Sequence, residues 1–183
     1  PAPPPSAAAG GSETAVADEV ATIPMGPSVD RPSWDDEDWR RFRAALEVGW
    51  SEGLDTLPMG EAVARMGLHF VGTPYEPQTL EVPGPERVVV NLRALDCVTF
   101  VESVLALTTL VRTHDATLLT NRAQAELTFE QQLAGLRYRD GEPQGYASRL
   151  HYFSEWLSRN TERRHLRLVT RELGGVEDPE PIY

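Results

Sequence analysis

The chain has one cysteine, Cys97, and its sequence context makes it a candidate nucleophile. Asp96 precedes it and apolar residues follow at helical spacing, so Cys97 is predicted to begin a helix that Asp96 caps. Unpaired N–H groups and the helix dipole at that end favour the thiolate, the form that attacks carbonyl carbon atoms. The same apolar stripe is also typical of a small cysteine buried in a core, and both interpretations remain open. A lone cysteine excludes an internal disulfide and a thiolate-rich zinc site.

A second group of chemically capable side chains lies downstream, within residues 146–153. Ser148 is predicted either to cap a helix or to offer its hydroxyl to a ligand. Arg149 is predicted either to pair with an acid or to bind a carboxylate through two nitrogens of its fork. His151 and Tyr152 would lie beside the same ligand in the functional interpretation.

Four histidines are available as a general base for the thiol, and His151 is the best placed. His69 falls within a predicted helix, and His114 ends the helix that Cys97 begins, about 25 Å away along its axis. His165 lies in an arginine-rich run that is typical of a solvated face. Even His151, placed on a predicted helix, is more typical of a structural or substrate-contacting histidine than of a base. We expect no metal and no cofactor, because the spacing of His, Asp and Glu typical of a metal site is absent.

The hydrophobic pattern predicts mostly helices around these residues. Helices are predicted at about 34–52, 59–71, 97–112, 116–136 and 147–160. Short strands are predicted at 78–82 and 87–91, with one more at about 166–170. A sheet of so few strands offers too little surface for so many helices to pack against. Either the protein is mainly helical, or its sheet lies in sequence beyond this chain.

The N-terminal segment, residues 1–30, is predicted to be a disordered tether. It opens with only proline, alanine, glycine and serine, and the remainder adds acids without a base, so it has too little apolar surface to fold. Residues 31–183 then form the N-terminal, helix-rich part of one domain. The chain begins with proline and shows no targeting signal, so we expect it to be a piece of a longer protein.

The charge of the chain argues against two classes of partner. The chain has 17 basic and 28 acidic residues, which gives a formal net charge of −11. This field repels phosphate backbones and anionic headgroups, so we expect no nucleic acid partner. The longest apolar stretch, residues 98–111, is shorter than the roughly 20 residues of a membrane helix, so we expect no membrane insertion.

Three short motifs resemble one enzyme superfamily, in the same order along the chain. Residues 95–102, Leu-Asp-Cys-Val-Thr-Phe-Val-Glu, resemble the Asp-Cys-Ser-Gly-Phe-Val segment of the NlpC-type cell-wall hydrolases. Residues 70–75 resemble the Gly-Thr-Pro-Tyr segment of the same superfamily. Residues 138–141 and 146–153 resemble its N-acetylmuramoyl-L-alanine amidase-like branch, and the resemblance covers about 59–175.

The resemblance implies an α+β, papain-like fold. A helix-rich lobe would carry Cys97 at a helix N-terminus and pack on an antiparallel sheet. The resemblance also implies that Cys97 is the nucleophile and that Tyr75 lines the active site. It places substrate-binding roles on Ser148, Arg149, His151 and Tyr152.

The implied activity is cysteine-dependent hydrolysis of peptidoglycan fragments, muropeptides, at the amide between the lactyl group of muramic acid and L-alanine. The implied location is the cell envelope or periplasm. The alternative is a non-catalytic muropeptide-binding or structural helical module, with Cys97 as a core residue.

One part of the superfamily pattern is missing from this sequence. The base of these enzymes is a histidine on a strand after the cysteine helix, in a His-Val-Gly context that does not occur here. We therefore expect the base, its orienting residue and most of the sheet to lie beyond Tyr183. We also expect this chain alone to be a poor catalyst, because loss of general-base assistance is costly.

Overall fold

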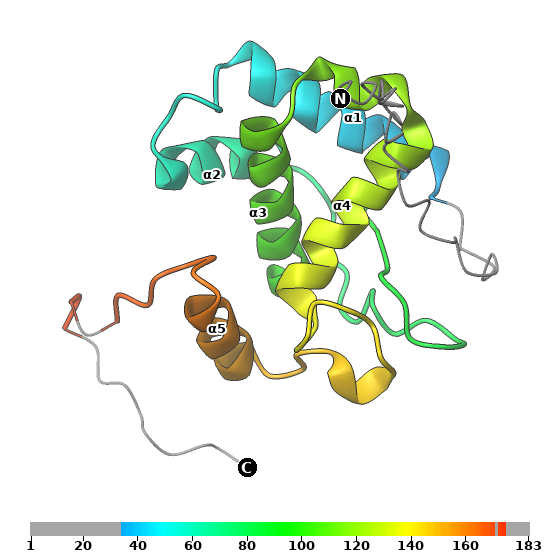
Figure 1. The fold of residues 1–183 in the computed structure, drawn as a ribbon, viewed down its shortest axis with the longest axis vertical. Coiled ribbons are helices and arrows are strands. Elements are labelled where there is room, and N and C mark those ends of the chain that lie inside the picture. The colour runs from blue at the N-terminus through cyan, green and yellow to red at the C-terminus, as the bar shows by residue number, and fades with distance from the viewer. Residues whose placement is uncertain (1–33, 171, 175–183) are drawn as a thin grey trace, which may run out of the picture. The chain divides into compact units, whose positions relative to one another are not determined.

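The computed structural model describes residues 34–170 and 172–174, and its regular elements are helices (Figure 1). In chain order they are α1 (Asp36–Ser51), α2 (Met59–Leu68), α3 (Cys97–Thr113), the 3-10 helix η1 (Ala116–Thr120), α4 (Arg122–Arg137), the 3-10 helix η2 (Tyr146–Ser148) and α5 (Phe153–Glu162). The predicted tether at residues 1–30 lies outside the described residues.

Helix α3 is the centre of the fold. It packs against α1, α2 and α4, and α4 also packs against η1 and α5 (Figure 1). The facing surfaces of α1, α2, α3, η1 and α4 bury apolar side chains in one core cluster, which excludes water. The largest fully buried members include Phe42, Leu46, Met66, Leu107, Leu110, Phe129 and Leu133. Within the described part of the chain, no helix is both long enough and apolar enough to cross a membrane.

Local capping explains where the helices begin. The carboxylate of Asp35 accepts the backbone N–H of Glu37 at 2.7 Å, and the acidic first turn of α1 suits the positive end of its dipole. Asn121 caps α4 by accepting the N–H of Gln124 at 3.2 Å. That cap divides the single helix predicted at 116–136 into η1 and α4.

The expected α+β fold is wrong for the described residues, which form helices and no strands. The segments predicted as strands, 78–82, 87–91 and 166–170, are irregular. Two prolines flank Gly84 between the first two segments, and Gly84 has a φ of 103°. Proline fixes φ, so this Pro-Gly-Pro connection does not match the tight turns that usually close a hairpin.

Side chains hold the segment 78–91 in place of a ladder. Arg149 donates to the carbonyl of Leu80 at 3.0 Å, and Arg137 donates to the carbonyl of Val89 at 2.8 Å. Backbone pairing is limited, among the described residues, to two isolated bridges that involve other segments. The loop therefore satisfies its buried carbonyls through arginine side chains.

The helix predicted at 147–160 begins later than expected. Ser148 ends η2, and Arg149 is extended and forms an antiparallel bridge with Tyr138. The N–H of Leu150 donates to the carbonyl of Arg137 at 2.9 Å. This short pairing fixes residues 149–150 against the end of α4, so α5 begins only at residue 153.

The contact between α1 and α3 predicts a large effect for one substitution. Gly49→Ala is expected to lower the free energy of unfolding by about 1–3 kcal/mol. A Cβ at Gly49 would lie 2.6 Å from Cγ2 of Val111 and 3.1 Å from Cε of Met66. Val111 is β-branched and buried, so its methyl group has no other rotamer to adopt without moving the helix.

Gly135→Ala in α4 is the matched control, because nothing lies within 4 Å of the added Cβ. It should raise the free energy of unfolding by about 0.4–1 kcal/mol, since alanine restricts the unfolded chain. Urea unfolding measures both variants. Equal stability of the two would contradict a close α1–α3 contact.

Candidate functional site

The first turn of α3 presents Cys97 as a capped helix N-terminus requires. The carboxylate of Asp96 accepts the N–H groups of Val98 at 3.0 Å and Thr99 at 2.8 Å. The Thr99 hydroxyl accepts the N–H of Asp96 at 2.9 Å, which completes a capping box. The predicted helix start and the predicted cap are both confirmed.

Cys97 is exposed to solvent. Neighbouring positions on α3, such as Thr99 and Glu102, point into the protein instead. The interpretation of Cys97 as a small core residue is therefore wrong in this structure. A thiol that is exposed at the positive end of a helix is open to a carbonyl substrate.

The capping box gives a prediction for the stability of this turn. Asp96→Ala is expected to lower the free energy of unfolding by about 1 kcal/mol, because two backbone N–H groups lose their acceptor. Asp96→Asn is the matched control, since its amide oxygen still accepts these bonds, and it should cost less. Thermal unfolding of the two variants checks the order, and a larger loss for the asparagine variant would contradict the capping role.

The structure brings Tyr75 to the same end of α3 although 22 residues separate it from Cys97 in the sequence. Tyr75 forms a parallel bridge with Leu95, with the N–H of Leu95 donating to the carbonyl of Pro74 at 3.0 Å. Its side chain is 71% exposed. The backbone of Tyr75 is thus held beside the residue two positions before Cys97, and contact between its phenol and a substrate stays a prediction.

A cavity of about 200 Å³ opens beside this turn. Its walls come from the loop at 78–81, the start of α3, the end of α4, the segment 149–151 and the start of α5. Asp96 and Val98, the two neighbours of Cys97, line it together with His151 and Arg149. Two sequence segments that were singled out for their chemistry, 95–102 and 146–153, therefore meet at one cavity.

The floor of the cavity is a buried ion pair. Arg137 donates through Nε to Glu102 at 2.8 Å, and the side chains are 3% and 1% exposed. The indole N–H of Trp156 donates to the other oxygen of Glu102 at 3.1 Å. Glu102 thereby ties α3 to the end of α4 and to α5, and all three residues line the cavity.

Arg149 is buried and already paired. Its Nη2 donates to Glu81 at 2.5 Å and its Nη1 donates to the carbonyl of Leu80, while the guanidinium carbon lies 5.1 Å from the centre of the Tyr146 ring. Only 4% of its side chain is exposed. A substrate carboxylate would have to displace Glu81 to gain the fork of Arg149.

His151 and Ser148 belong to the same folded loop. Nε2 of His151 lies 2.8 Å from the carbonyl of Tyr146, and the two rings lie 4.2 Å apart. A carbonyl only accepts, so Nε2 carries the proton and Nδ1 of the neutral ring remains an acceptor. The Ser148 hydroxyl donates to the carbonyl of Gly145 at 2.7 Å and does not cap a long helix. Tyr152 precedes α5 and is 70% exposed.

The other histidines lie elsewhere in the fold. His69 follows the last turn of α2, and His114 follows the last turn of α3, at the opposite end from Cys97. His165 lies beyond α5, where partial burial lowers its pKa and Arg163 lowers it further. His151 is the histidine that lines the cavity.

Tyr138 supports the wall of this region without being ionised. Its hydroxyl lies 2.8 Å from both the Glu86 carboxylate and the carbonyl of Arg87. Burial raises the pKa of Tyr138, and the hydrogen bond to Glu86 raises it further. The phenol therefore remains a neutral donor that holds the loop 86–87 against α4.

Helix α5 is fixed to the end of α4 by a paired fork. Nε and Nη2 of Arg139 each donate to the Glu155 carboxylate at 2.7 Å. These hydrogen bonds hold the pKa of Glu155 below its ordinary value of 4.5. Because the pKa is lower in the folded state, the pair stabilises the fold above about pH 4.5 and loses this contribution as the pH falls.

Glu155→Gln is therefore expected to flatten the acid limb of the stability curve. The wild-type free energy of unfolding should fall more steeply between about pH 5 and pH 3 than that of the variant. Glu162→Gln on the same helix is the control, since Glu162 pairs with Arg159 at 3.2 Å through side chains that are about half exposed. Urea unfolding at several pH values gives both slopes, and identical acid limbs for wild type and Glu155→Gln would contradict this account.

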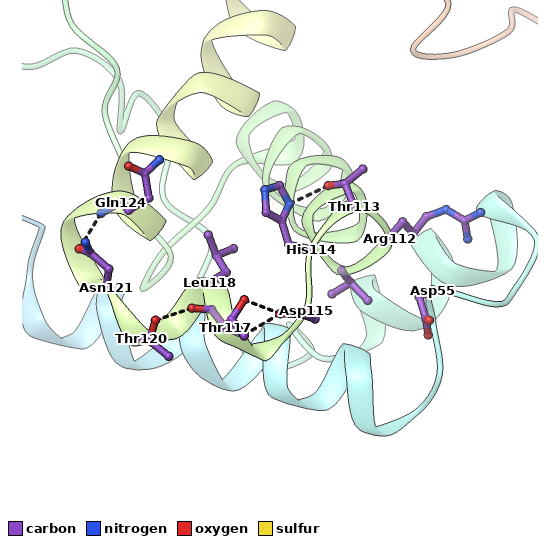
Figure 2. Close-up of a pocket in the computed structure, with 11 residues that line it drawn as sticks. Asp55, Arg112, Thr113, His114, Asp115, Thr117, Leu118, Thr120, Asn121 and Gln124 are labelled. Atoms are coloured by element: carbon purple, nitrogen blue, oxygen red, sulfur yellow. Dashed lines mark hydrogen bonds between the residues drawn. The ribbon is translucent and has the colours of Figure 1, made fainter. Parts of the chain in front are cut away.

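A larger hollow, about 650 Å³, lies at the other end of α3 (Figure 2). Its polar side chains are engaged with one another or with helix ends: Asp115 accepts from Thr117, and His114 lies 2.8 Å from the Thr113 hydroxyl. The hydrogen bonds from Thr117 lower the pKa of Asp115. None of the residues predicted to form the site lines this hollow, and its capping groups have structural roles.

Three cavity residues, Glu102, Arg137 and Trp156, were not among the predicted site residues. The available signal was Glu102, a single acid within the otherwise apolar stretch 98–111. Such a residue is buried only when it is paired. The sequence does not identify its partner, because 35 positions separate Arg137 from it. Among the described residues, no cluster of three His, Cys, Asp or Glu side chains could hold a metal ion.

Comparison with known families gives one match. The family model AmiA-like, described as N-acetylmuramoyl-L-alanine amidase-like, matches residues 65–179. The matched segment contains Cys97, the cavity and all of the predicted site residues. No curated protein matches the chain.

Similar solved structures include two from the genus Bacteroides. An N-acetylmuramoyl-L-alanine amidase from Bacteroides uniformis is 37% identical over 57% of this chain and 40% of that chain, with a TM-score of 0.47. A protein from Bacteroides fragilis that is provisionally described as a xylanase is 40% identical over 58% of this chain and 42% of that chain, with a TM-score of 0.46. The chain thus spans about two fifths of the length of these solved chains.

Proposed function

Because the chain belongs to the N-acetylmuramoyl-L-alanine amidase-like family, we propose that it takes part in hydrolysis of the amide between the lactyl group of N-acetylmuramic acid and L-alanine, with Cys97 as nucleophile. The observation that carries this proposal is the exposed thiol on the first residue of a capped helix, beside a cavity. The family placement supports the reaction, and the position of Cys97 supports its part in it. An NlpC-type mechanism is part of the same proposal.

The chemistry follows from the position of the thiol. The Cys97 thiolate attacks the lactyl carbonyl carbon, and the positive end of the α3 dipole stabilises the negative oxygen that forms, while the N–H groups of Val98 and Thr99 stay bonded to Asp96. The carbon–nitrogen bond then breaks, and the nitrogen of L-alanine takes up a proton as it leaves. Water attacks the resulting thioester, which releases the lactyl carboxylic acid and restores the thiol.

Three exposed side chains are proposed to contact the substrate. Tyr75 and Tyr152 offer phenol groups, and Nδ1 of His151 offers an acceptor to an amide N–H. Ser148 and Arg149 are proposed to hold the loop that carries His151, since their polar atoms are bonded within that loop and to 80–81. Muropeptides in the cell envelope are the proposed substrates, in keeping with the family.

The test is hydrolysis of N-acetylmuramoyl-L-alanine by the 183-residue chain. Mass spectrometry of acid-quenched protein should show an acyl group on Cys97, and free L-alanine should appear slowly, because the general base is expected to be missing from this chain. Since the chain has one cysteine, prior alkylation with iodoacetamide is a specific control and should remove both signals. Binding of the muropeptide without any release of L-alanine would support the non-catalytic binding module instead.

A further inference from the structure

The cavity beside Cys97 has an excess of negative charge. Glu81, Asp96 and Glu102 line it, against Arg137 and Arg149. Each arginine is already bonded to one of these acids. A carboxylate that entered the cavity would meet one unmatched negative charge, and like charges brought together in an interface are strongly disfavoured.

The floor nevertheless offers one hydrogen-bond donor. Arg137 uses Nε for Glu102 and Nη1 for the carbonyl of Val89. No hydrogen bond joins its Nη2 to another described residue. This nitrogen is also not one of the fully buried side-chain atoms that lack a hydrogen-bond partner. Arg137 lines the cavity, so its unbonded Nη2 is the donor that a ligand there would use, and the adjacent Glu102 oxygens have lone pairs left to accept.

The remaining wall is apolar. The rings of Phe153 and Trp156 are stacked with their planes 9° apart and their centres 5.7 Å apart, and buried Leu150 lies in the same lining. The volume, about 200 Å³, is below the roughly 300–1,000 Å³ of pockets that enclose a drug-sized ligand. The cavity therefore suits one substituent of a larger molecule.

We infer that this cavity binds the acetamido group of the substrate's amino sugar. The carbonyl of an acetamido group accepts from Arg137, its N–H donates to Glu102, and its methyl group lies against Trp156. The group is uncharged, as the surplus of acids requires. The inference rests on the proposed function and extends it, because Asp96 and Val98, the two neighbours of Cys97, line the cavity.

The experiment measures binding to the full chain carrying Cys97→Ala, by isothermal titration calorimetry. The ligands are N-acetylmuramoyl-L-alanine, its N-succinyl analogue with an added carboxylate, and an analogue with a hydroxyl group in place of the acetamido group. The N-acetyl compound should bind at least about tenfold more tightly than either analogue, since both leave a buried polar group unmatched or add a repelled charge.

Glu81→Gln gives a readout that a purely structural cavity would not show. Glu81 is about half exposed, so the variant should remain folded while it removes one acid from the lining. The variant should reduce the difference in affinity between the N-acetyl and N-succinyl compounds. The difference in affinity between the N-acetyl compound and the hydroxyl analogue should stay unchanged. Glu52→Gln, at the end of α1 and outside the lining, should change neither difference.

The outcomes separate this inference from the proposed function. Equal binding of the three compounds, or no binding of the N-acetyl compound, overturns the inference. Hydrolysis of all three by the wild-type chain at one rate also overturns it while the amidase proposal stands. A preference for the N-acetyl compound in Cys97→Ala, without hydrolysis by the wild type, supports the cavity assignment and removes the proposed catalytic role.

Discussion

Cys97→Ala is expected to reduce the slow release of L-alanine from N-acetylmuramoyl-L-alanine by about 10²- to 10⁴-fold, because the roughly 10⁶-fold loss seen in a complete enzyme is reduced by the 10²- to 10⁴-fold assistance of the base that this chain is expected to lack. The variant has no atom that can form the thioester, and the chain has no second cysteine to replace it. Folding should be unaffected. Cys97 is exposed, so its truncation should change the free energy of unfolding by no more than about 0.5 kcal/mol.

The matched control is Cys97→Ser, which keeps a polar atom of similar size at the helix N-terminus. Without an activating base, a serine hydroxyl is a much weaker nucleophile than a thiolate. This variant should therefore also lack the acyl adduct. Reaction progress is followed by chromatography of L-alanine, and the adduct by intact-protein mass spectrometry. If either variant turned over at the wild-type rate, Cys97 would not be the nucleophile.

The start of α3 could be predicted from the sequence because its signals are local. Asp96, the apolar spacing behind it and the threonine at position 99 all act within one turn of helix. Such short-range capping is encoded by neighbouring residues, so the helix boundary at Cys97 is confirmed. The exposure of the thiol could not be predicted, because the same apolar stripe fits a buried face and an exposed one.

The strands were predicted wrongly for a reason that lies outside their own segments. Residues 78–82 and 87–91 have suitable side chains for strands, but a ladder depends on a partner strand. In the structure the carbonyl groups of Leu80 and Val89 bind Arg149 and Arg137 from far along the chain. A pattern confined to a few neighbouring residues carries no record of such contacts.

The cavity floor illustrates the same limit at the site itself. The motif at 146–153 indicated Arg149 as a ligand-binding arginine, yet Glu81 occupies its fork in the structure. Arg137, which no motif indicated, lines the cavity and has one nitrogen that is not bonded to another described residue. Sequence spacing indicated two segments that the structure brings to one cavity, and tertiary pairing decided which charged side chains there are already bonded.

The second large effect concerns the ion pair under the cavity. Glu102→Leu is expected to lower the free energy of unfolding by about 3–5 kcal/mol, because it leaves the Arg137 guanidinium buried without its counter-charge. Trp156 would also lose the acceptor for its indole N–H, which adds a second unmatched polar group. For a chain of this size the loss corresponds to a fall in Tm of about 6–20 °C.

The double variant Glu102→Leu with Arg137→Met tests the physical cause. Removing both charges removes the desolvation penalty together with the attraction, so the double variant should be more stable than Glu102→Leu alone by about 1–4 kcal/mol. Urea unfolding of the wild type, both single variants and the double variant completes the cycle. A double variant no more stable than Glu102→Leu would show that the carboxylate acts through Trp156 and packing, and that Arg137 is not the partner whose charge it neutralises.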